Sequence, residues 1–390
     1  MGKLFADRLE FLGGNVFATI DRVKQEVLRQ GKPLIDLSLG SADLPTHPVI
    51  LAAIAQALQD SSTHGYVLFG QTRQFREAVA GWFGRRFGIA VDPETEVLPL
   101  IGSQEGTAHL PLALLNPGDY ALLQDPGYPS HYGGVYLASG LPWGMPLRAD
   151  LGYLPDLAAI PAAVLSQAKL MILSYPHNPT TAVANLDFFR SVVQFCQRHG
   201  LWLIHDFPYM DIVFDGYVAP AMLQADPEKT VTIEFFTLSK SYNMGGFRVG
   251  FAIGNRQLIS ALRQIKAVVD FNQYQGILRG AITALASDET IVKQSVEEFQ
   301  RRRDFMVTAL NSLGWQVEKP QATMYLWAKI PHPNSMQFCQ RLIYEQGIAL
   351  SPGSGFGKAG EGFVRFALVH PVEKLQVVID RLQNFLIDND

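Results

Sequence analysis

Short apolar runs separated by helical patterns dominate the chain from about residue 96 onward. The runs are continuous rather than alternating between apolar and polar residues, as expected of strands covered on both faces. They read EVLPLI, DYALLQD, KLMILSYP, LWLIHDF, VTIEFFTLS and RVGFAIG. Helical patterns such as EGTAHLPLALL and LDFFRSVVQFCQRHG lie between them. The pattern predicts an α/β fold with a mainly parallel sheet and helices on both faces.

The alternation of short apolar runs and helical patterns ends at about residue 285. A long amphipathic pattern, ETIVKQSVEEFQRRRDFMVTALNSLG, precedes strands expected at WQVEK and MYLWAKI and a helix around NSMQFCQRLIYEQG. Strands at IALSP and GFVRFALV and a closing helix from Pro371 follow. The helical stretch VFATIDRVKQEVLRQ near the start is expected to pack with this part. We therefore predict a large domain over residues 45–285 and a smaller α+β domain formed by residues 1–44 and 286–390.

Composition and charge narrow the class of protein. The chain has 390 residues, 48% of them hydrophobic, which suffices for a large core and about two domains. Lys and Arg number 32 against 36 Asp and Glu, for a net charge of −4 without long runs of one sign. This balance argues against a nucleic-acid partner and favours a small-molecule one.

Cysteine usage and hydropathy suggest a cytoplasmic protein. The two cysteines, Cys196 and Cys339, lack CxxC spacing, so we expect buried thiols rather than disulfides or a zinc site. We also find neither a signal-peptide pattern at the N-terminus nor a run of about 18 apolar residues, so no membrane partner is expected.

Polar side chains follow several of the predicted strands. Because the carboxyl ends of parallel strands meet at one edge of a sheet, these residues are expected to converge on one ligand site. They are Ser103, Gln104, Tyr128, Asn178, Asp206, Tyr209, Ser239, Lys240 and Arg248.

These residue types match the needs of pyridoxal 5'-phosphate. Its aldehyde needs a lysine amine for a Schiff base, which Lys240 can supply, and its ring nitrogen needs a carboxylate, which Asp206 can supply. Its phenolic oxygen needs hydrogen-bond donors, and Asn178 and Tyr209 can donate. We therefore predict Lys240, Asp206 and Tyr209 as the catalytic residues.

The phosphate and the ring of the cofactor need further groups. A phosphate binds at a helix N-terminus with hydroxyl groups and an arginine, and Ser103 and Gln104 open a predicted helix. Ser239 and Arg248 flank the lysine and complete this set, while Tyr128 offers a flat face for the ring.

Three motifs resemble those of the class I and II aminotransferases, which are fold type I pyridoxal phosphate enzymes. The motifs are NP at 178–179, DFPY at 206–209 and SKSYNMGGFRVG at 239–250, and their order and spacing make the resemblance specific. It extends from DLSLGSADLPTHP to FVRFAL, which is most of the chain. The motifs are most similar to those of the bacterial subgroup that contains LL-diaminopimelate, aspartate and alanine aminotransferases.

The resemblance implies roles for residues outside the strand ends. Gly40 lies by the substrate, and Arg365 binds the substrate α-carboxylate, for which a planar guanidinium is suited; Asn178 also contacts the substrate. Tyr66 reaches the cofactor phosphate of the neighbouring subunit, which implies a homodimer with active sites at the interface. Asn272 stands where some relatives contact the cofactor from the partner chain.

Two positions depart from the family pattern. Relatives often carry lysine where this chain has Gln104, and tryptophan where it has Phe247. Neither position bears on the imine chemistry, but the first is expected to weaken phosphate binding slightly. No second arginine can be assigned to a side-chain carboxylate of the substrate, so the amino donor stays open.

The resemblance implies a transaminase that moves an amino group from an L-amino acid to a 2-oxo acid, usually 2-oxoglutarate, with LL-diaminopimelate or a general aspartate or alanine type of donor. Two alternatives stay open. A pyridoxal phosphate-dependent β C–S lyase uses the same residue types, and a non-enzymatic pyridoxal phosphate-binding sensor shares the fold. The segment before residue 40 is short and not basic, which argues against an attached DNA-binding module.

Two other patterns do not mark sites. GFGKAG at 355–360 satisfies GxGxxG but precedes a strand-like run, whereas a dinucleotide fingerprint precedes a helix. His199, His205 and Asp206 are spread over a turn and a strand without a common face, so no metal site is predicted.

Overall fold

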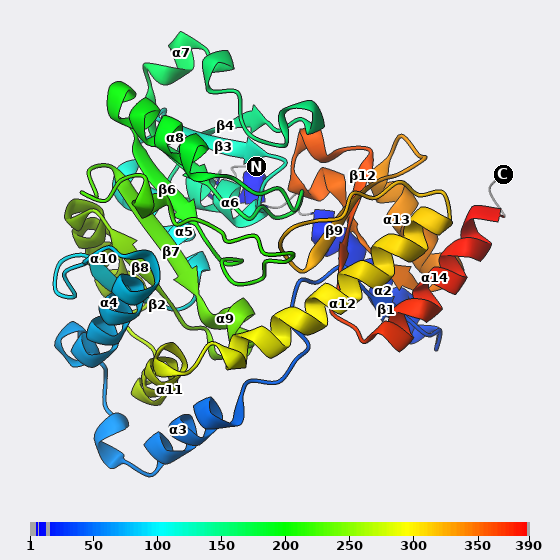
Figure 1. Ribbon diagram of the computed structural model, residues 1–390. Helices are drawn as coiled ribbons and strands as arrows, with labels where there is room; N and C mark the ends of the chain where they lie inside the picture. The colour runs from blue at the N-terminus through cyan, green and yellow to red at the C-terminus, as the bar shows by residue number, and fades with distance from the viewer. Residues whose placement is uncertain (1–4, 7, 13–15, 388–390) are drawn as a thin grey trace.

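The structure, a computed structural model, describes residues 5–6, 8–12 and 16–387 of the chain. The predicted small domain includes residues 1–4, 7, 13–15 and 388–390, which lie outside the described residues. Figure 1 shows two units side by side, a larger one around an extended sheet and a smaller one that carries the C-terminal helix. Helix α12 (Thr290–Ser312) runs from the larger unit into the smaller one.

A seven-stranded sheet forms the centre of the larger unit. The order across the sheet is β2 (Val97–Leu100), β8 (Gly250–Gly254), β7 (Thr232–Thr237), β6 (Trp202–Asp206), β5 (Ala168–Leu173), β3 (Tyr120–Asp125) and β4 (Leu141–Pro146). The five strands from β7 to β4 in this order pair in parallel, whereas β8 pairs antiparallel with both β2 and β7. The expected mainly parallel sheet is therefore confirmed.

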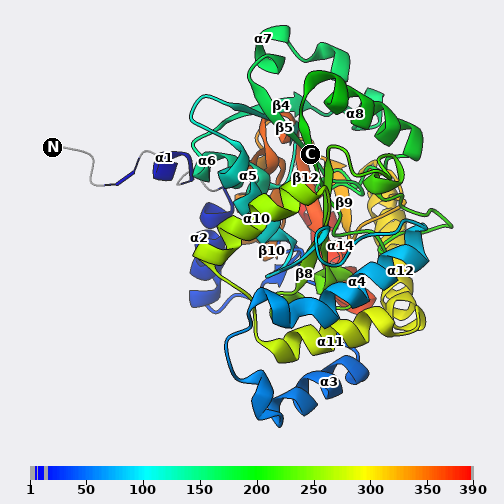
Figure 2. The ribbon, with the colours of Figure 1, turned by 90° about the vertical axis from the view of Figure 1, so that its left-hand side faces the viewer.

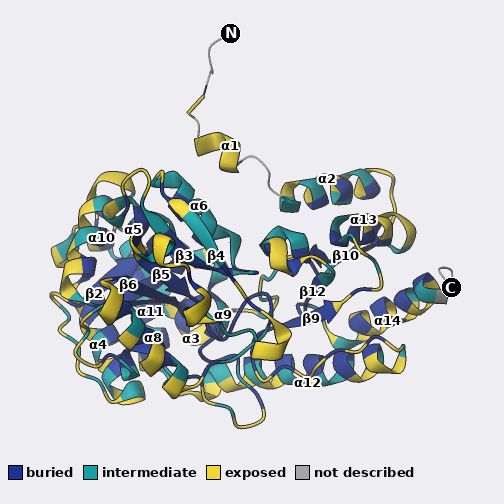
Figure 3. Ribbon diagram, turned by 90° about the horizontal axis from the view of Figure 1, so that it is seen from above, coloured by how far each residue is buried: buried dark blue, intermediate teal, exposed yellow. Residues whose placement is uncertain are grey.

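The strands are buried on both faces, which explains their uninterrupted apolar runs. In β5, Leu170 and Ile172 belong to one hydrophobic cluster, and Met171 and Leu173 belong to another on the opposite face. Side chains of a strand point alternately to its two faces, so each face requires its own apolar set. Figure 3 shows the central strands as mostly buried, with most exposed residues on the outer helices and loops.

Helices cover both faces of this sheet. On one face lie α5 (Ser103–Leu114), α6 (Pro129–Leu137) and α10 (Arg256–Val269). On the other lie α4 (Arg73–Phe87), α8 (Leu186–His199) and α11 (Gln275–Ala286). Helix α3 (Pro48–Leu58) packs against α11 at one end of the molecule, as Figures 1 and 2 show, and α7 (Ala162–Leu165) lies at the other end.

The smaller unit has its own core and two small sheets. The antiparallel sheet orders β11 (Ser351–Pro352), β12 (Phe363–Ala367) and β9 (Tyr325–Lys329), and β1 (Ile35–Asp36) pairs in parallel with β10 (Ile348–Ala349). Its helices are α2 (Val16–Arg29), part of α12, α13 (Ser335–Gln346) and α14 (Val372–Ile387), while α1 (Arg8–Leu12) lies beside α6. Because side chains from residues 20–37 and 306–385 share this core, we propose that residues 1–44 and 286–390 form one domain.

The expected strand at WQVEK, residues 315–319, is wrong. The side chains of Trp315 and Val317 are buried in the small-domain core, which explains the strand-like pattern. The backbone of Val317, however, pairs with a side chain: its N–H donates to Oδ1 of Asn311 at 2.9 Å, and its carbonyl accepts from Nδ2 of Asn311 at 3.1 Å. With these groups satisfied locally, Val317 needs no neighbouring strand.

Strand β4 was not expected because its sequence, LPWGMP, contains two prolines and a glycine. Proline lacks a backbone donor and is tolerated only at a sheet edge, and β4 is an edge strand that pairs with β3 alone. Both cysteines are buried free thiols, as expected. Across the described ranges, no helix is both long and apolar enough to cross a membrane.

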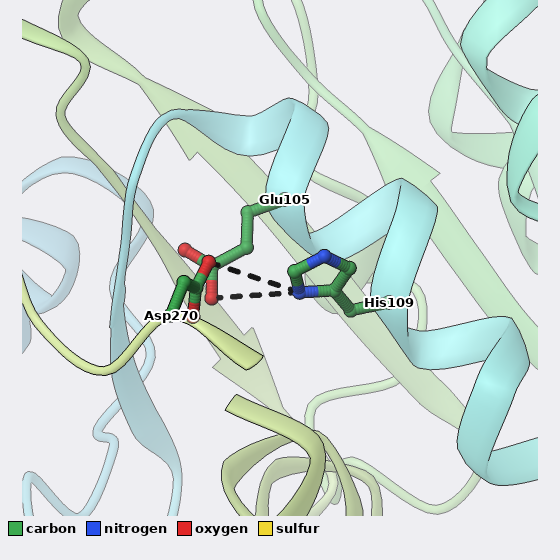
Figure 4. A group of neighbouring side chains, drawn as sticks. All are labelled: Glu105, His109 and Asp270. Carbon is green, nitrogen blue, oxygen red and sulfur yellow. Dashed lines mark ion pairs between the residues drawn. The ribbon is translucent and has the colours of Figure 1, made fainter. Parts of the chain in front are cut away.

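A buried charge cluster joins α5 to α10. Figure 4 shows Glu105, His109 and Asp270, whose ligand atoms lie close enough together to hold a metal ion. The buried ammonium of Lys266, however, already lies 2.8 Å from Oε1 of Glu105 and 3.5 Å from Oδ1 of Asp270. Glu105 also accepts a hydrogen bond from the backbone N–H of Ile101, so the cluster fixes the loop that opens α5.

Burial raises the pKa of Glu105 to about 7, although the charge of Lys266 and the hydrogen bond from Ile101 act in the opposite direction. Between the ordinary pKa of 4.5 and about 7, the folded chain therefore holds a proton that the unfolded chain releases. The contribution of Glu105 to stability falls as the pH rises through this window.

We predict that Lys266→Met destabilises the chain by about 3–5 kcal/mol near pH 8, because it leaves a buried carboxylate without its cation. The loss should be smaller near pH 5.5, where the isolated Glu105 carboxyl binds a proton. Urea unfolding at the two pH values measures both quantities. The matched control is Lys293→Met, whose side chain is 73% exposed beside Glu297 and should cost less than about 1 kcal/mol. Equal losses in the two variants would contradict this account.

Candidate functional site

A cavity of about 570 Å³ lies at the carboxyl ends of the central strands, where the two units meet. Eleven of the thirteen residues with expected site roles line it: Gly40, Ser103, Gln104, Tyr128, Asn178, Asp206, Tyr209, Ser239, Lys240, Arg248 and Arg365. Gly40 and Arg365 come from the smaller unit, and the other nine come from the larger one. The structure therefore brings these residues together.

Lys240 lies directly after β7, on the single-turn helix α9 (Leu238–Ser241). Its Nζ donates a hydrogen bond to the backbone oxygen of Gly40. Burial lowers the pKa of Lys240; Tyr325 opposes this shift, and the positive charges of Arg365 and Arg248 add to it. A lysine amine in this setting is neutral, and hence nucleophilic, at a lower pH than an exposed one.

Asp206 ends β6 and is almost fully buried. Its Oδ2 lies 3.2 Å from Nε2 of His131. This histidine lies on α6, and Tyr128 is the N-cap residue of that helix. Oδ1 of Asp206 is buried without a hydrogen-bond partner among the described residues. A buried carboxylate oxygen is costly to leave unpaired, so this atom marks a place for a ligand donor.

The start of α5 and the segment after Lys240 form one cradle. Gly102 precedes α5 with φ of 74°, and a Cβ on it would lie 2.7 Å from Nη2 of Arg248, so only glycine allows this approach. Arg248 has φ of 51°, a left-handed conformation rare for a residue with a side chain. Its guanidinium lies at a helix N-terminus beside Ser103, and Ser239 lines the same cavity, an arrangement suited to an anion.

Arg365 is held on several sides. Its Nη1 donates to Oδ1 of Asn178 at 2.7 Å, and its Nη2 donates to the backbone oxygen of Ser38 at 2.7 Å and to Oγ of Ser351 at 3.2 Å. Its Cζ lies 4.2 Å from the ring centroid of Tyr325 and 4.8 Å from that of Phe356. Three of its five N–H groups are thus engaged, and its Nε is buried without a hydrogen-bond partner among the described residues.

Two residues with expected roles across a subunit interface do not line this cavity. Tyr66 is 90% exposed. Asn272 donates from Nδ2 to the backbone oxygen of Val67 at 2.9 Å, which ties the segment of Tyr66 to the residues that follow α10. Neither residue reaches the cavity of its own chain.

Several cavity residues escaped the sequence analysis. Tyr325 and Phe356 line the cavity, but Tyr325 lies in an apolar run and Phe356 in a glycine-rich stretch, and neither pattern marks a site. His131 contacts Asp206 without lining the cavity, and only HY after DPGYPS hints at it. Asp21 and Lys24 line the cavity from α2, where the pattern indicates an ordinary amphipathic helix.

The rejected patterns have structural explanations. Nδ1 of His205 lies 2.7 Å from Oε1 of the buried Glu234, and its Nε2 accepts from the N–H of Tyr175, so this histidine is fully engaged within the sheet. His199 ends α8, away from Asp206 in β6. Residues 355–360 precede β12 rather than a helix.

The residues present fit pyridoxal phosphate. Asp206 offers an unpaired buried carboxylate oxygen to a ring nitrogen, Lys240 offers an amine with a lowered pKa, and the cradle of Ser103 and Arg248 offers donors to a phosphate. The donor set is that of an anionic, ring-shaped ligand with a reactive carbonyl carbon.

Comparison with known proteins gives close matches. Residues 32–382 match the family described as aminotransferase class I and II. The chain is 42% identical over 382 residues to LL-diaminopimelate aminotransferase 2 of Trichormus variabilis, a match that covers 97% of this chain and 98% of that protein. It is also 42% identical over 379 residues to LL-diaminopimelate aminotransferase of Dehalococcoides mccartyi, covering 97% and 98%.

A solved structure agrees with these matches. The probable N-succinyldiaminopimelate aminotransferase of Thermus thermophilus superposes with a TM-score of 0.90 at 44% identity, over 95% of this chain and 99% of that one. The family match includes every cavity-lining residue that was predicted from the sequence.

The lowered pKa of Lys240 is directly measurable. In the cofactor-free chain, an amine-reactive reagent should modify Lys240 with a pH midpoint below that of an exposed lysine such as Lys293, because burial and the nearby arginines disfavour the ammonium. Peptide mass spectrometry across a pH series gives both midpoints and separates them from differences in access, which change only the rates. A Lys240 midpoint equal to or above that of Lys293 would show that its amine is not activated.

Proposed function

The chain belongs to the class I and II aminotransferases, and from this premise we propose that its amino donor is an L-amino acid of the diaminopimelate type and its acceptor 2-oxoglutarate. As a member of the family it is a transaminase that acts on amino acids and 2-oxo acids. The family is known to use pyridoxal phosphate. The observation that best supports a working site is that Lys240, Asp206 and Arg365 line one cavity.

We propose that this chain binds pyridoxal phosphate, which when bound supplies an aldehyde carbon that bonds covalently to amines and a ring that withdraws electrons from Cα of the amino acid. Lys240 provides the amine that holds the cofactor and then, once free, removes the proton from the substrate Cα as general base. Asp206 keeps a proton on the ring nitrogen, and His131 beside it holds the carboxylate in place.

The other cavity residues hold and orient the cofactor. Ser103, Gln104, Ser239 and Arg248 bind the phosphate, with Gln104 offering an amide in place of the charge that a lysine would bring. Tyr128 covers the ring face, while Tyr209 and Asn178 donate to the phenolic oxygen.

Substrate orientation depends on the smaller unit. Arg365 binds the α-carboxylate, with a charge-assisted hydrogen bond contributing on the order of 1.5–3 kcal/mol. Gly40 lines the cavity beside Lys240, and its lack of a side chain lets the Tyr325 hydroxyl approach its backbone.

The diaminopimelate skeleton is favoured by the names of the relatives and by the far wall of the cavity. Two relatives are named for LL-diaminopimelate and the Thermus protein for its N-succinyl derivative. Asp21 and Lys24 of α2 line the same cavity, so a donor with a polar far end meets charges of both signs there. Nζ of Lys24 lies 2.9 Å from Oδ2 of Asp36, which holds its ammonium in place.

The alternatives raised by the sequence are not favoured. The three relatives described above match over nearly the whole chain and are named aminotransferases. The cytoplasmic location stays a prediction.

A panel of amino donors tests the proposal. With the holoenzyme, LL-diaminopimelate or its N-succinyl derivative should convert the bound cofactor, followed by its absorbance, with kcat/KM at least about tenfold above that of L-alanine or L-aspartate. L-cystathionine is the control for lyase chemistry. Equal kcat/KM values for all donors would contradict the proposal of a diaminopimelate-type donor. Release of pyruvate and ammonia from cystathionine would indicate a lyase.

We further propose that the chain forms a homodimer in which Tyr66 reaches the phosphate of the partner's cofactor. Tyr66 and Val268 are 90% and 87% exposed, and Leu58 and Leu68 are each 55% exposed. The bond from Asn272 to Val67 holds the Tyr66 segment beside the end of α10, so these apolar side chains belong to neighbouring segments. Exposed apolar residues gathered in this way favour a subunit interface.

Mixed dimers test the role of Tyr66. Lys240→Ala and Tyr66→Ala subunits should each be nearly inactive, but a dimer of one of each should regain about half of the wild-type activity. In that dimer, one site combines the intact Lys240 of one subunit with the intact Tyr66 of the other. The proposal would be contradicted if isolated mixed dimers recovered no activity. It would also be contradicted if a chain that sediments as a monomer were fully active in the assay.

A further inference from the structure

Tyr325 is a buried phenol at the junction of the two units, outside the sequence motifs and without a role in the proposed mechanism. It begins β9, is 2% exposed and lines the cavity. It pairs with Ala367 on β12, so Arg365, two residues earlier, is its diagonal neighbour on the same face of the sheet. This register places the guanidinium Cζ 4.2 Å from the ring centroid of Tyr325.

The hydroxyl of Tyr325 contacts the other side of the cavity. It lies 2.8 Å from the hydroxyl of Tyr209, which belongs to the larger unit. It also lies so close to Gly40 that a Cβ on that glycine would be 1.8 Å from the Tyr325 oxygen. Gly40 in turn accepts the hydrogen bond from Nζ of Lys240. One side chain therefore contacts the carboxylate-binding arginine, the proposed phenolic donor and the backbone that holds the lysine.

Two side chains that can carry a positive charge, Arg365 and Lys240, act on the hydroxyl of Tyr325. The titratable or charged groups that face it are Tyr128, Tyr209, Lys240 and Arg365. Burial opposes ionisation of Tyr325, but the charges of Arg365 and Lys240 and the bond with Tyr209 outweigh it and lower its pKa. Burial, with the negative influence of Tyr325, raises the pKa of Tyr209. Either hydroxyl of the pair can donate the hydrogen bond, so Tyr209 can still donate to the cofactor when Tyr325 donates to Tyr209.

We propose that Tyr325 is a positioning residue that joins the two halves of the site: its ring carries the guanidinium of Arg365, and its hydroxyl orients Tyr209 and supports the positive charge of the Lys240 amine. The assignment of carboxylate binding to Arg365 rests on the proposed function. The contacts of the hydroxyl do not depend on it. The ring and the hydroxyl thus have separate effects that separate substitutions can measure.

Removal of the hydroxyl tests the first effect. In the cofactor-free chain, Tyr325→Phe should lower the pH midpoint for chemical modification of Lys240 by about 0.5–1 unit, because the partner that favours the ammonium is gone. The matched control is Tyr217→Phe, which deletes a hydroxyl that donates to the backbone oxygen of Ala184 at 2.9 Å, away from the cavity. The control should leave the Lys240 midpoint unchanged.

Removal of the ring tests the second effect. In the holoenzyme, Tyr325→Leu should raise KM for every amino donor by about fivefold or more, because a desolvated cation–π contact to Arg365 is lost, whereas Tyr325→Phe keeps the ring and should change KM by less than about twofold. Circular dichroism and the unfolding midpoint check that each variant folds. If Tyr325→Leu fails to fold, the Lys240 midpoint in Tyr325→Phe still decides the question.

An unchanged Lys240 midpoint in Tyr325→Phe would overturn the proposal. So would KM values that are the same in the folded Tyr325→Leu variant and the wild type. A wild-type chain that transfers no amino group would instead refute the proposed function. The modification of Lys240 needs no cofactor, so it decides the role of the hydroxyl in either case.

Discussion

The chemistry of this chain depends on keeping one lysine amine partly buried among positive charges. Lys240 follows a strand that is buried on both faces, and burial together with Arg365 and Arg248 lowers its pKa. An amine in this state is nucleophilic at a lower pH than an exposed one, and anionic ligands would balance the nearby arginines. A phosphate and a carboxylate are such groups, so the features that activate the lysine also select its ligands.

The second requirement is that two units meet at one edge of the sheet. The larger unit contributes the lysine, the buried Asp206 and the cradle at α5, whereas the smaller one contributes Gly40, Tyr325 and Arg365. Polar contacts cross the junction, from Arg365 to Asn178 and from Tyr325 to Tyr209. In the proposed site, the position of the smaller unit would therefore set the geometry of the substrate carboxylate relative to the amine.

The sequence revealed the parts of the fold with a strong local cause. Doubly covered strands need continuous apolar runs, so the central sheet was predictable, and the strand ends led to Asp206 and Lys240. Strand β4 was missed because its prolines suit only an edge, which is a property of the assembled sheet. The error at residues 315–319 arose because Asn311 satisfies the backbone of Val317. Tyr325 and His131 were missed because their partners, Tyr209 and Asp206, are distant in the chain.

The most direct test of this account is borohydride reduction of the holoenzyme followed by peptide mapping. Reduction should fix the cofactor irreversibly to a single peptide, the one that contains Lys240, and the Lys240→Ala chain should give no modified peptide. Modification of a different lysine, or a wild-type chain that stays unmodified while it is active, would contradict the account.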